Sequence, residues 1–447
     1  MLKTKKVSFL IMALVLTVVF TGQVFAGGGS QSQQQGVNLR FWTFLDPSNP
    51  TNPRATVLAK LIQQFEAKTG NRITTEPQEW PTMAAKFYAA HAANNAPDVV
   101  MVNTVNLGEG VRIGCFEPFE NLFMKNWTRA QIDDYDNAMF RLGTDDGKHY
   151  QFPLFFGLFT LAYREDLFKQ FNINPNFRTW DDLVKAAQTL THVDRNGMQV
   201  YGFGSGYGLE VSDYQNYLVT ALISQEGSLF MNDGKPNNWA GQVAQQALRH
   251  QIDMIDNLKI TPASSVSMSV EDLYNNFSAG QLAMIIVNSV RVPTLKANAT
   301  YDPNAIQLMG FPLMLDGKQG LSNLAGWHLG VWRNGRQKAV AGDFIESLIN
   351  ADADTLWITE GVQLPMRKSS SQINTVSAFF NRPENTWMRS AAQVLANSSW
   401  CIPSNAVASG LTNDMQQAML EAYVEKVPIQ KALQDMSDAF TARNIGR

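Results

Sequence analysis

Five segments between residues 37 and 102 decide the fold: VNLRFWT at 37–43, a helical stretch at 55–69, RITT at 72–75, a second helical stretch at 82–94 and DVVMV at 98–102. In the stretch at 55–69, apolar residues recur every three to four positions and a glycine follows, which predicts an amphipathic helix. Strands that alternate with helices pair in parallel, and the helices cover the sheet. These segments therefore predict an α/β fold.

The same alternation restarts at residue 151. Residues 151–159 are apolar and aromatic, and Thr179 is the expected N-cap of a helix that runs to Leu190. Further strands are expected at 200–204, 282–287 and 327–332, and further helices at 214–226, 240–258 and 339–350. We therefore expect two lobes, each a mainly parallel sheet flanked by helices, joined by several crossings of the chain.

Polar and aromatic residues follow the ends of the first three expected strands. Trp42 ends the first strand, Trp80 comes shortly after the second, and the segment Asn103–Asn106 follows the third. Ligands bind at the carboxyl ends of the strands in such sheets. Sequence order therefore places these residues at one rim of the sheet.

The first 26 residues have the pattern of a secretory signal peptide. Three lysines precede the apolar run Val7–Phe20, which is too short to span a bilayer comfortably, and Val24-Phe25-Ala26 resembles a cleavage site. An uncleaved membrane anchor is the alternative. Residues 27–36 then form a flexible tether. Because no cysteine directly follows Ala26 for lipid attachment, we expect an exported, periplasmic protein.

Composition excludes several classes of protein. Of the 447 residues, 45% are hydrophobic and 11% aromatic, and the formal net charge is −3. Such a chain folds rather than stays disordered, and without a block of Lys and Arg it is not expected to bind nucleic acid. Cys115 and Cys401 either pair in the exported protein or are buried free thiols, and we favour the second interpretation.

The sequence lacks the usual motifs for metal binding and catalysis. None of the five histidines lies in an H-E-x-x-H motif, and no C-x-x-C is present. The glycine-rich segment Gly202–Gly208 fits no phosphate-binding template and is interpreted as a turn. Carboxylates cluster at residues 133–136, 145–146 and 181–182, where solvated positions in turns and helix starts are typical. We therefore expect no cofactor, no metal site and no catalytic residue.

Tryptophans beside polar residues indicate a sugar ligand. The chain has ten Trp, and Trp42, Trp80, Trp239, Trp327 and Trp400 lie beside polar residues near expected loop boundaries. Aromatic rings bury the apolar faces of a sugar, while amides, carboxylates and Arg bond its hydroxyls. Each of these tryptophans is equally compatible with ordinary core packing.

Several short motifs, in their order and spacing, resemble the bacterial extracellular solute-binding proteins of ABC importers. The resemblance is to the carbohydrate-type group, which includes maltodextrin- and glycerol-phosphate-binding proteins, and it covers nearly the whole chain after the signal peptide. The motifs are FEAKTG at 65–70, APDVV at 96–100, GKHYQFP at 147–153, YREDLF at 163–168, TWDDL at 179–183, FSAGQLAM at 277–284 and GVQLPMR at 361–367.

The resemblance implies the type II binding-protein fold, with a ligand cleft between two lobes. The N-terminal lobe would comprise residues 37–154 and 327–372, and the C-terminal lobe residues 155–326 and 373–447. The lobes would close on a sugar-like ligand, and the closed monomer would then dock on membrane-embedded permease subunits. Carried over by position in the motifs, the expected ligand-binding residues are Trp42, Asp46, Trp80, Asn103, Asn106, Tyr214, Trp239, Asn288, Arg291, Trp327, Arg367 and Trp400.

Two arginines keep the chemistry of the ligand open. Arg291 replaces an aromatic residue often found near that position in the family. Arg367 suits forked polar recognition, and we favour a binding role for it over the alternative of a structural ion pair. A non-sugar or phosphorylated solute, such as a phosphodiester, a polyamine or an amino acid, is therefore an alternative to a sugar. A secreted glycoside-active enzyme is a second alternative, which would need two carboxylates facing each other across a cleft.

Overall fold

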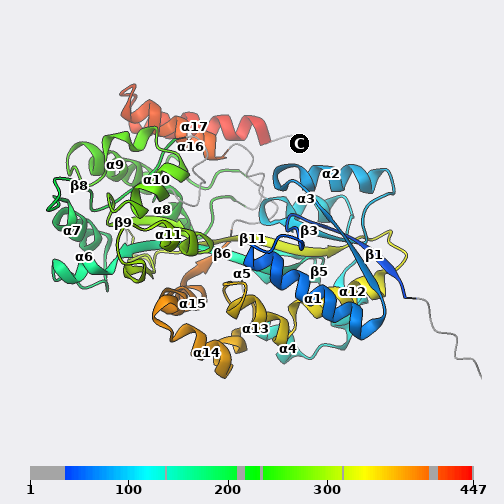
Figure 1. The fold of residues 1–447 in the computed structure, drawn as a ribbon. Coiled ribbons are helices and arrows are strands. Elements are labelled where there is room, and N and C mark those ends of the chain that lie inside the picture. The colour runs from blue at the N-terminus through cyan, green and yellow to red at the C-terminus, as the bar shows by residue number, and fades with distance from the viewer. Residues whose placement is uncertain are drawn as a thin grey trace, which may run out of the picture. The chain divides into compact units, whose positions relative to one another are not determined.

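Two long strands, β6 (Phe152–Arg164) and β11 (Ser322–Val331), run side by side between the helices α1–α3 and the helices α6–α11 (Figure 1). They belong to an eight-stranded sheet with the order β10-β6-β11-β3-β1-β2, in which β12 also pairs with β11 and β9 with β6. The same two strands therefore support both ends of the sheet.

The structure, a computed structural model, describes residues 36–135, 138–208, 217–231, 235–314, 317–401 and 411–444. The expected signal peptide, nearly all of the tether and Tyr214 lie outside these residues. The remaining strands are β1 (Asn38–Thr43), β2 (Arg72–Pro77), β3 (Val99–Asn103), β4 (Thr144–Asp145), β5 (Lys148–His149), β7 (His192–Val193), β8 (Gln199–Val200), β9 (Met284–Asn288), β10 (Ile306–Met309) and β12 (Ser399–Trp400).

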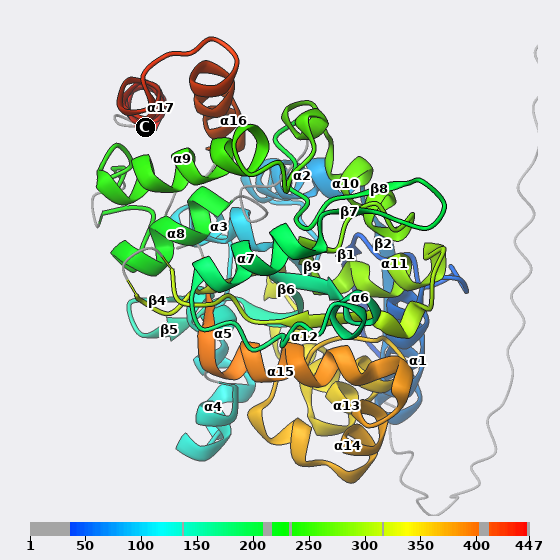
Figure 2. The ribbon, with the colours of Figure 1, turned by 90° about the vertical axis from the view of Figure 1, so that its left-hand side faces the viewer.

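The helices cover both faces of this sheet. They are α1 (Pro53–Thr69), α2 (Trp80–Ala92), α3 (Leu107–Arg112), α4 (Arg129–Tyr135), α5 (Ala138–Leu142), α6 (Glu165–Gln170), α7 (Trp180–Leu190), α8 (Tyr217–Glu226), α9 (Gln242–Asp256), α10 (Val270–Ser278), α11 (Val292–Asn298), α12 (Lys338–Ile349), α13 (Ala351–Thr359), α14 (Asn374–Phe380), α15 (Thr386–Ser398), α16 (Leu411–Tyr423) and α17 (Ile429–Asn444). Figure 2 shows α13–α15 on one side of β6 and α7–α9 on the other.

Strand direction differs from the expectation of mainly parallel sheets. β1 pairs in parallel with β2 and β3, and β11 with β12, but β11 runs antiparallel to β3 and β6, as β6 does to β9 and β10. The sheet is mixed because β11 enters between β3 and β6 from the opposite direction. Local sequence patterns carry no information about that choice.

Several element boundaries also differ from the sequence prediction. β6 and β11 extend beyond the expected 151–159 and 327–332, and Pro153 is accommodated where the β6–β11 register shifts between Trp327 and His328. The second helix begins at Trp80 rather than near Thr82, because Pro81 fits the first helical turn. The strand expected at 200–204 is reduced to β8 with isolated bridges. The predicted cap at Thr179 is confirmed, with a full capping box.

Buried side chains form two large cores. The first core gathers residues of α1, β1, β3, α12 and α13 with those of α10, α11, α14 and α15. The second core gathers α7, α8 and α9 with α16 and α17. Residues from both β6 and β11 take part in each core or pack against it, so the two strands connect them.

Cys115 and Cys401 are both buried free thiols. In the residues that the structure describes, no helix combines the length and the apolar character that crossing a membrane requires. The described part of the chain also contains no group of three His, Cys, Asp or Glu side chains arranged to hold a metal ion.

His328 of β11 makes stability depend on pH. Its ring is fully buried, Nε2 donates to the Met139 carbonyl at 2.9 Å, and burial lowers its pKa from 6.5 to about 4. The unfolded chain therefore binds a proton between these values that the folded chain does not, and stability is lost as pH falls through this window. We expect wild type to lose about 2 kcal/mol of unfolding free energy from this group between pH 6.5 and pH 4.5.

Urea unfolding of His328→Gln, measured beside wild type at both pH values, checks this expectation. Glutamine keeps an N–H donor for the Met139 carbonyl but does not titrate. The difference in unfolding free energy between the two proteins should shrink at the lower pH. A difference that stays constant with pH would contradict the assignment.

Candidate ligand-binding site

The two cores meet on one face of the central strands. Phe155, Gly157 and Phe159 alternate along β6 and therefore share this face, with Phe155 in the first core and Phe159 in the second. On β11, Trp327 lies opposite Phe155 in the first core, and Ala325 lies opposite Gly157 and packs against the second core. Ala325 is only half-buried, although its strand has neighbours on both sides. The helices thus leave this part of the sheet partly accessible.

We call this face the central strip. It consists of Phe155, Gly157, Phe159, Asn323, Ala325 and Trp327, together with the residues paired to them on the neighbouring strands, Asn103, Asn288 and Trp400.

Amide side chains from both ends of the sheet reach the strip. Asn103 is the β3 partner of Trp327, and Asn288 is the β9 partner of Phe159; both are half-buried. A Cβ atom at Gly157 would lie 1.8 Å from Asn288 Oδ1, so glycine is required for the Asn288 amide to lie across β6. The two asparagines therefore approach the same uncovered area from opposite sides.

Asn323 is the third amide of the strip and the most deeply buried. It is 3% exposed, and neither its amide oxygen nor its amide nitrogen has a hydrogen-bond partner in the described part of the chain. It shares its face with Ala325 and Trp327 because the three alternate along β11. An amide left unpaired in an interior costs free energy, so Asn323 is a strong candidate for a group that bonds a ligand.

Aromatic rings gather at the first-core end of the strip. Trp327 stacks on Phe44 with ring centroids 4.2 Å apart, and Trp80 packs edge-on against Trp327 at 6.3 Å. The Trp80 side chain is 59% exposed, an unusual position for so large an apolar ring. Together these rings offer apolar surface next to the polar strip.

Arg54 lies beside the same rings. Its guanidinium carbon is 5.6 Å from the centre of Phe44 and 5.4 Å from that of Phe155. Burial lowers the pKa of Arg54, and among the described residues its guanidinium has neither a hydrogen bond nor an ion pair. Contact with ring faces offsets only part of the cost of removing a cation from water.

Trp400 forms the second-core end of the strip. It pairs with Asn323 in parallel register, is half-buried and packs against the second core. Its indole N–H donates to the Gly227 carbonyl at 3.1 Å. The strip is thus bounded by Trp327 at one end and Trp400 at the other.

Four of the predicted ligand-binding residues are strand residues that belong to the strip: Asn103, Asn288, Trp327 and Trp400. Trp80 lies next to the strip. Asn106 lies just past β3, is half-buried and accepts a hydrogen bond from the Tyr88 hydroxyl through its carbonyl. Asp46 is exposed in the loop after β1, where bonds from the Ser48 hydroxyl and backbone N–H hold its pKa low.

Three other predicted residues lie elsewhere. Trp42 occupies the opposite face of the sheet, where its indole N–H donates to Glu76 at 2.6 Å. Trp239 lies inside the second core, with its indole N–H bonded to the Leu229 carbonyl at 2.6 Å. Arg291 pairs with Glu271 at 2.5 Å. Each of these side chains already has a structural partner.

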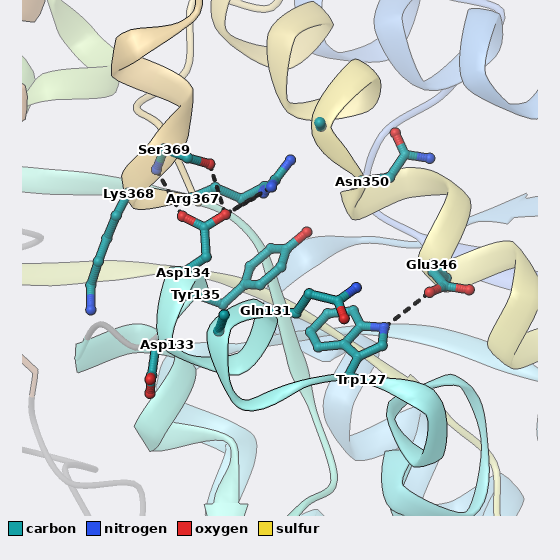
Figure 3. Close-up of a pocket in the computed structure, with 12 residues that line it drawn as sticks. Trp127, Gln131, Asp133, Asp134, Tyr135, Glu346, Asn350, Arg367, Lys368 and Ser369 are labelled. Atoms are coloured by element: carbon teal, nitrogen blue, oxygen red, sulfur yellow. Dashed lines mark hydrogen bonds and ion pairs between the residues drawn. The ribbon is translucent and has the colours of Figure 1, made fainter.

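Arg367 lines a separate cavity of about 770 Å³ between α4, the α12–α13 junction and residues 367–369 (Figure 3). Its Nε donates to Asp134 at 2.8 Å, and the backbone and hydroxyl of Ser369 donate to the same carboxylate at 2.8 and 2.7 Å. On the other side of the cavity Trp127 donates to Glu346 at 3.0 Å. Much of the polar lining is thus bonded within the protein, and Arg367 acts there as part of an ion pair that ties α4 to the segment after α13.

Sequence reasoning missed Phe44, Arg54 and Asn323. Phe44 directly follows β1, and Arg54 lies in the first turn of α1, so both follow the end of a strand that the sequence did predict. Their position after the end of that strand could have identified them as candidates for ligand binding. Asn323 gave none, because the strand in which it lies was expected to begin only at residue 327.

Comparison with known proteins assigns the family. Residues 48–355 match the family described as bacterial extracellular solute-binding protein, and this chain belongs to that family. The resemblance in the sequence is thereby confirmed.

A probable ABC transporter-binding protein of Deinococcus radiodurans is 25% identical over 233 residues, which are 51% of this chain and 53% of that protein. The diacetylchitobiose binding protein DasA of Streptomyces coelicolor is 22% identical over 200 residues, 44% of this chain and 42% of that protein. The chain thus spans about half the length of these relatives.

Solved structures show the same fold. The cyclic alpha-maltosyl-1,6-maltose binding protein of Arthrobacter globiformis matches with a TM-score of 0.74 at 18% identity, over 91% of this chain and 98% of that one. The sugar-binding protein MalE of Xanthomonas citri matches with a TM-score of 0.74 at 17% identity over the same shares. These likenesses confirm the solute-binding-protein fold that the sequence predicts.

The Asp134–Arg367 pair tests whether the cavity around Arg367 has a structural role, in contrast to the central strip, which we expect to bind the ligand. Burial raises the pKa of Asp134, but the bonds from Ser369 and the charge of Arg367 outweigh it and hold the pKa below its ordinary value. Asp134→Asn should lower the unfolding free energy by about 2 kcal/mol, because it leaves Arg367 without its counter-charge. Ligand affinity should not change.

Asp133→Asn is the matched control, since Asp133 pairs with Arg129 near the surface and such pairs contribute roughly 0–1 kcal/mol. Chemical denaturation and ligand titration of both variants give the answer. A loss of ligand affinity in Asp134→Asn without a loss of stability would contradict this interpretation.

Proposed function

We propose that this protein captures an extracellular sugar or oligosaccharide on the central strip and delivers it to the permease of an ABC importer without converting it chemically. The observation that carries the proposal is the strip itself. A sheet face shared by two cores stays partly uncovered between them, and aromatic and amide side chains from both ends of the sheet reach it. Such a surface suits a ring with apolar faces and many hydroxyls.

The names of related proteins support a sugar as the ligand. The relatives and solved structures named above include proteins whose names state a diacetylchitobiose or a cyclic maltosyl-maltose as ligand. The strip adds support of its own, since its own side chains carry no ionisable group and its amides both donate and accept. A neutral polyhydroxylated solute can satisfy both functions.

Capture requires the two ends of the strip to act together. We infer that residues 37–154 with 327–372, and residues 155–326 with 373–447, form two lobes that close on the ligand. The ends of the strip support two lobes, because Trp327 of the first lobe belongs to the first core and Phe159 of the second lobe belongs to the second core. A ligand favours closure only by the contacts that it gains in the closed form.

Export and docking complete the proposal. Residues 1–26 act as a signal peptide cleaved after Ala26, and the monomer works in the periplasm. The closed form then docks on membrane-embedded permease subunits, with no role in nucleic-acid binding and no catalytic activity.

An acidic or phosphorylated solute is the second candidate. Arg291 and Arg367 give it little support, because each is paired with a carboxylate. Arg54 is the observation in its favour, since its guanidinium adjoins the aromatic end of the strip and lacks a counter-charge among the described residues. An anion bound there would supply one.

A thermal-shift screen over sugars, sugar phosphates, polyols and amino acids tests the proposal. A true ligand at about 100 times its Kd should raise the unfolding free energy by about 2.7 kcal/mol. Trp80→Ala should weaken binding of that ligand roughly tenfold through the lost ring contact, with an unchanged melting temperature because the ring is exposed. Trp127→Phe, at the separate cavity, is the control and should leave affinity unchanged.

Mass spectrometry of the ligand after incubation checks that it is returned intact. Stabilisation by sugar phosphates alone would favour the second candidate. A ligand that is cleaved, or that binds Trp80→Ala as tightly as wild type, would contradict the proposal.

A further inference from the structure

The strip has a length that bears on the size of its ligand. Trp327 and Asn323 are four residues apart on β11, and Trp400 lies beside Asn323 in register. At about 3.4 Å per residue, the two tryptophan positions are about 13 Å apart along the strand. A single pyranose ring is too short to contact both.

Polar groups lie between these two ends. Asn288 reaches across Gly157, opposite Ala325, and Asn323 lies at the far end. The two residues that the strip places between the tryptophans, Gly157 and Ala325, are the smallest that a strand can carry. A ligand would therefore lie flat along β11 over a small-residue floor, with amides beside it.

We propose, on the basis of the function proposed above, that the strip binds a saccharide of at least two rings. One ring packs against Trp327, and the next extends along β11 to Trp400. The strip thus selects for chain length, and Trp400 is the residue that distinguishes an oligosaccharide from a monosaccharide.

In this proposal the Asn323 amide forms hydrogen bonds with the second sugar ring. Its unpaired amide costs free energy in the ligand-free protein, and a sugar hydroxyl that reaches it beside Trp400 would both donate to it and accept from it. This gives Asn323 an unusual signature: a nearly isosteric apolar replacement should stabilise the free protein while it weakens binding. An amide with a merely structural role would lower both.

Isothermal titration of the full exported chain tests the inference. The probes are three matched series: glucose, maltose and maltotriose; glucose, cellobiose and cellotriose; and N-acetylglucosamine, diacetylchitobiose and triacetylchitotriose. In at least one series the disaccharide or trisaccharide should bind roughly 100-fold or more tightly than the monosaccharide. Trp400→Ala should remove at least tenfold of that gain and leave the monosaccharide affinity unchanged.

Asn323→Leu keeps the test independent of folding defects. It should melt at the same temperature as wild type or higher, and bind the disaccharide and trisaccharide at least tenfold more weakly. Trp127→Phe should match wild type in its affinity for every saccharide. Equal affinity for one, two and three rings, or a loss in Trp400→Ala that is the same for every length, would overturn the length selection and leave sugar capture standing. Failure of every saccharide to bind would overturn both.

Discussion

The continuity of β6 and β11 through both cores is the constraint on which the rest of the structure depends. Two strands that pass through both cores bring the cores together at the central strip, where Ala325 stays half-buried, and the strip has a fixed floor. The Thr104 hydroxyl bonds both the N–H and the carbonyl of Gly326, at 2.7 and 2.8 Å, and a Cβ at Gly326 would lie 2.3 Å from the Phe155 carbonyl oxygen. Close backbone packing of this kind holds β3, β6 and β11 tightly together where the two proposed lobes meet.

Charge is distributed so that the floor itself remains neutral. The arginines that could have marked an anion site, Arg291 and Arg367, are held by carboxylates away from the strip. The cavity that Arg367 lines is bonded internally in the same way, since Asp134 and Glu346 are both held by partners within the protein. Arg54 is the exception. Because it lies beside Phe44, the first-core end of the strip determines whether the ligand is neutral or anionic.

The sequence predicted the alternation of strands and helices well, because amphipathic spacing and caps such as that of Thr179 are local properties. It also placed Trp80 and Asn103 at one rim, since residues that follow strand ends meet there, whereas Asn288 and Trp327 came from the family resemblance. Trp239 and Trp42 show the limit. A tryptophan beside polar residues has the same sequence appearance whether its ring enters a core, as in Trp239, or faces a ligand, and only tertiary packing distinguishes the two. Asn323 could not be predicted as a strand residue from the sequence, because the length of β11 depends on its pairing with β6, a contact between distant parts of the chain.

The most direct test of the account is hydrogen–deuterium exchange of the exported protein with and without a ligand that stabilises it. The account predicts that protection concentrates in peptides that cover residues 99–106, 155–159, 284–291 and 322–327, which carry the strip and its borders. Protection confined to residues 129–135 and 346–369, around the cavity between α4 and α13, would contradict it, because the ligand would then bind away from the face that the two cores share.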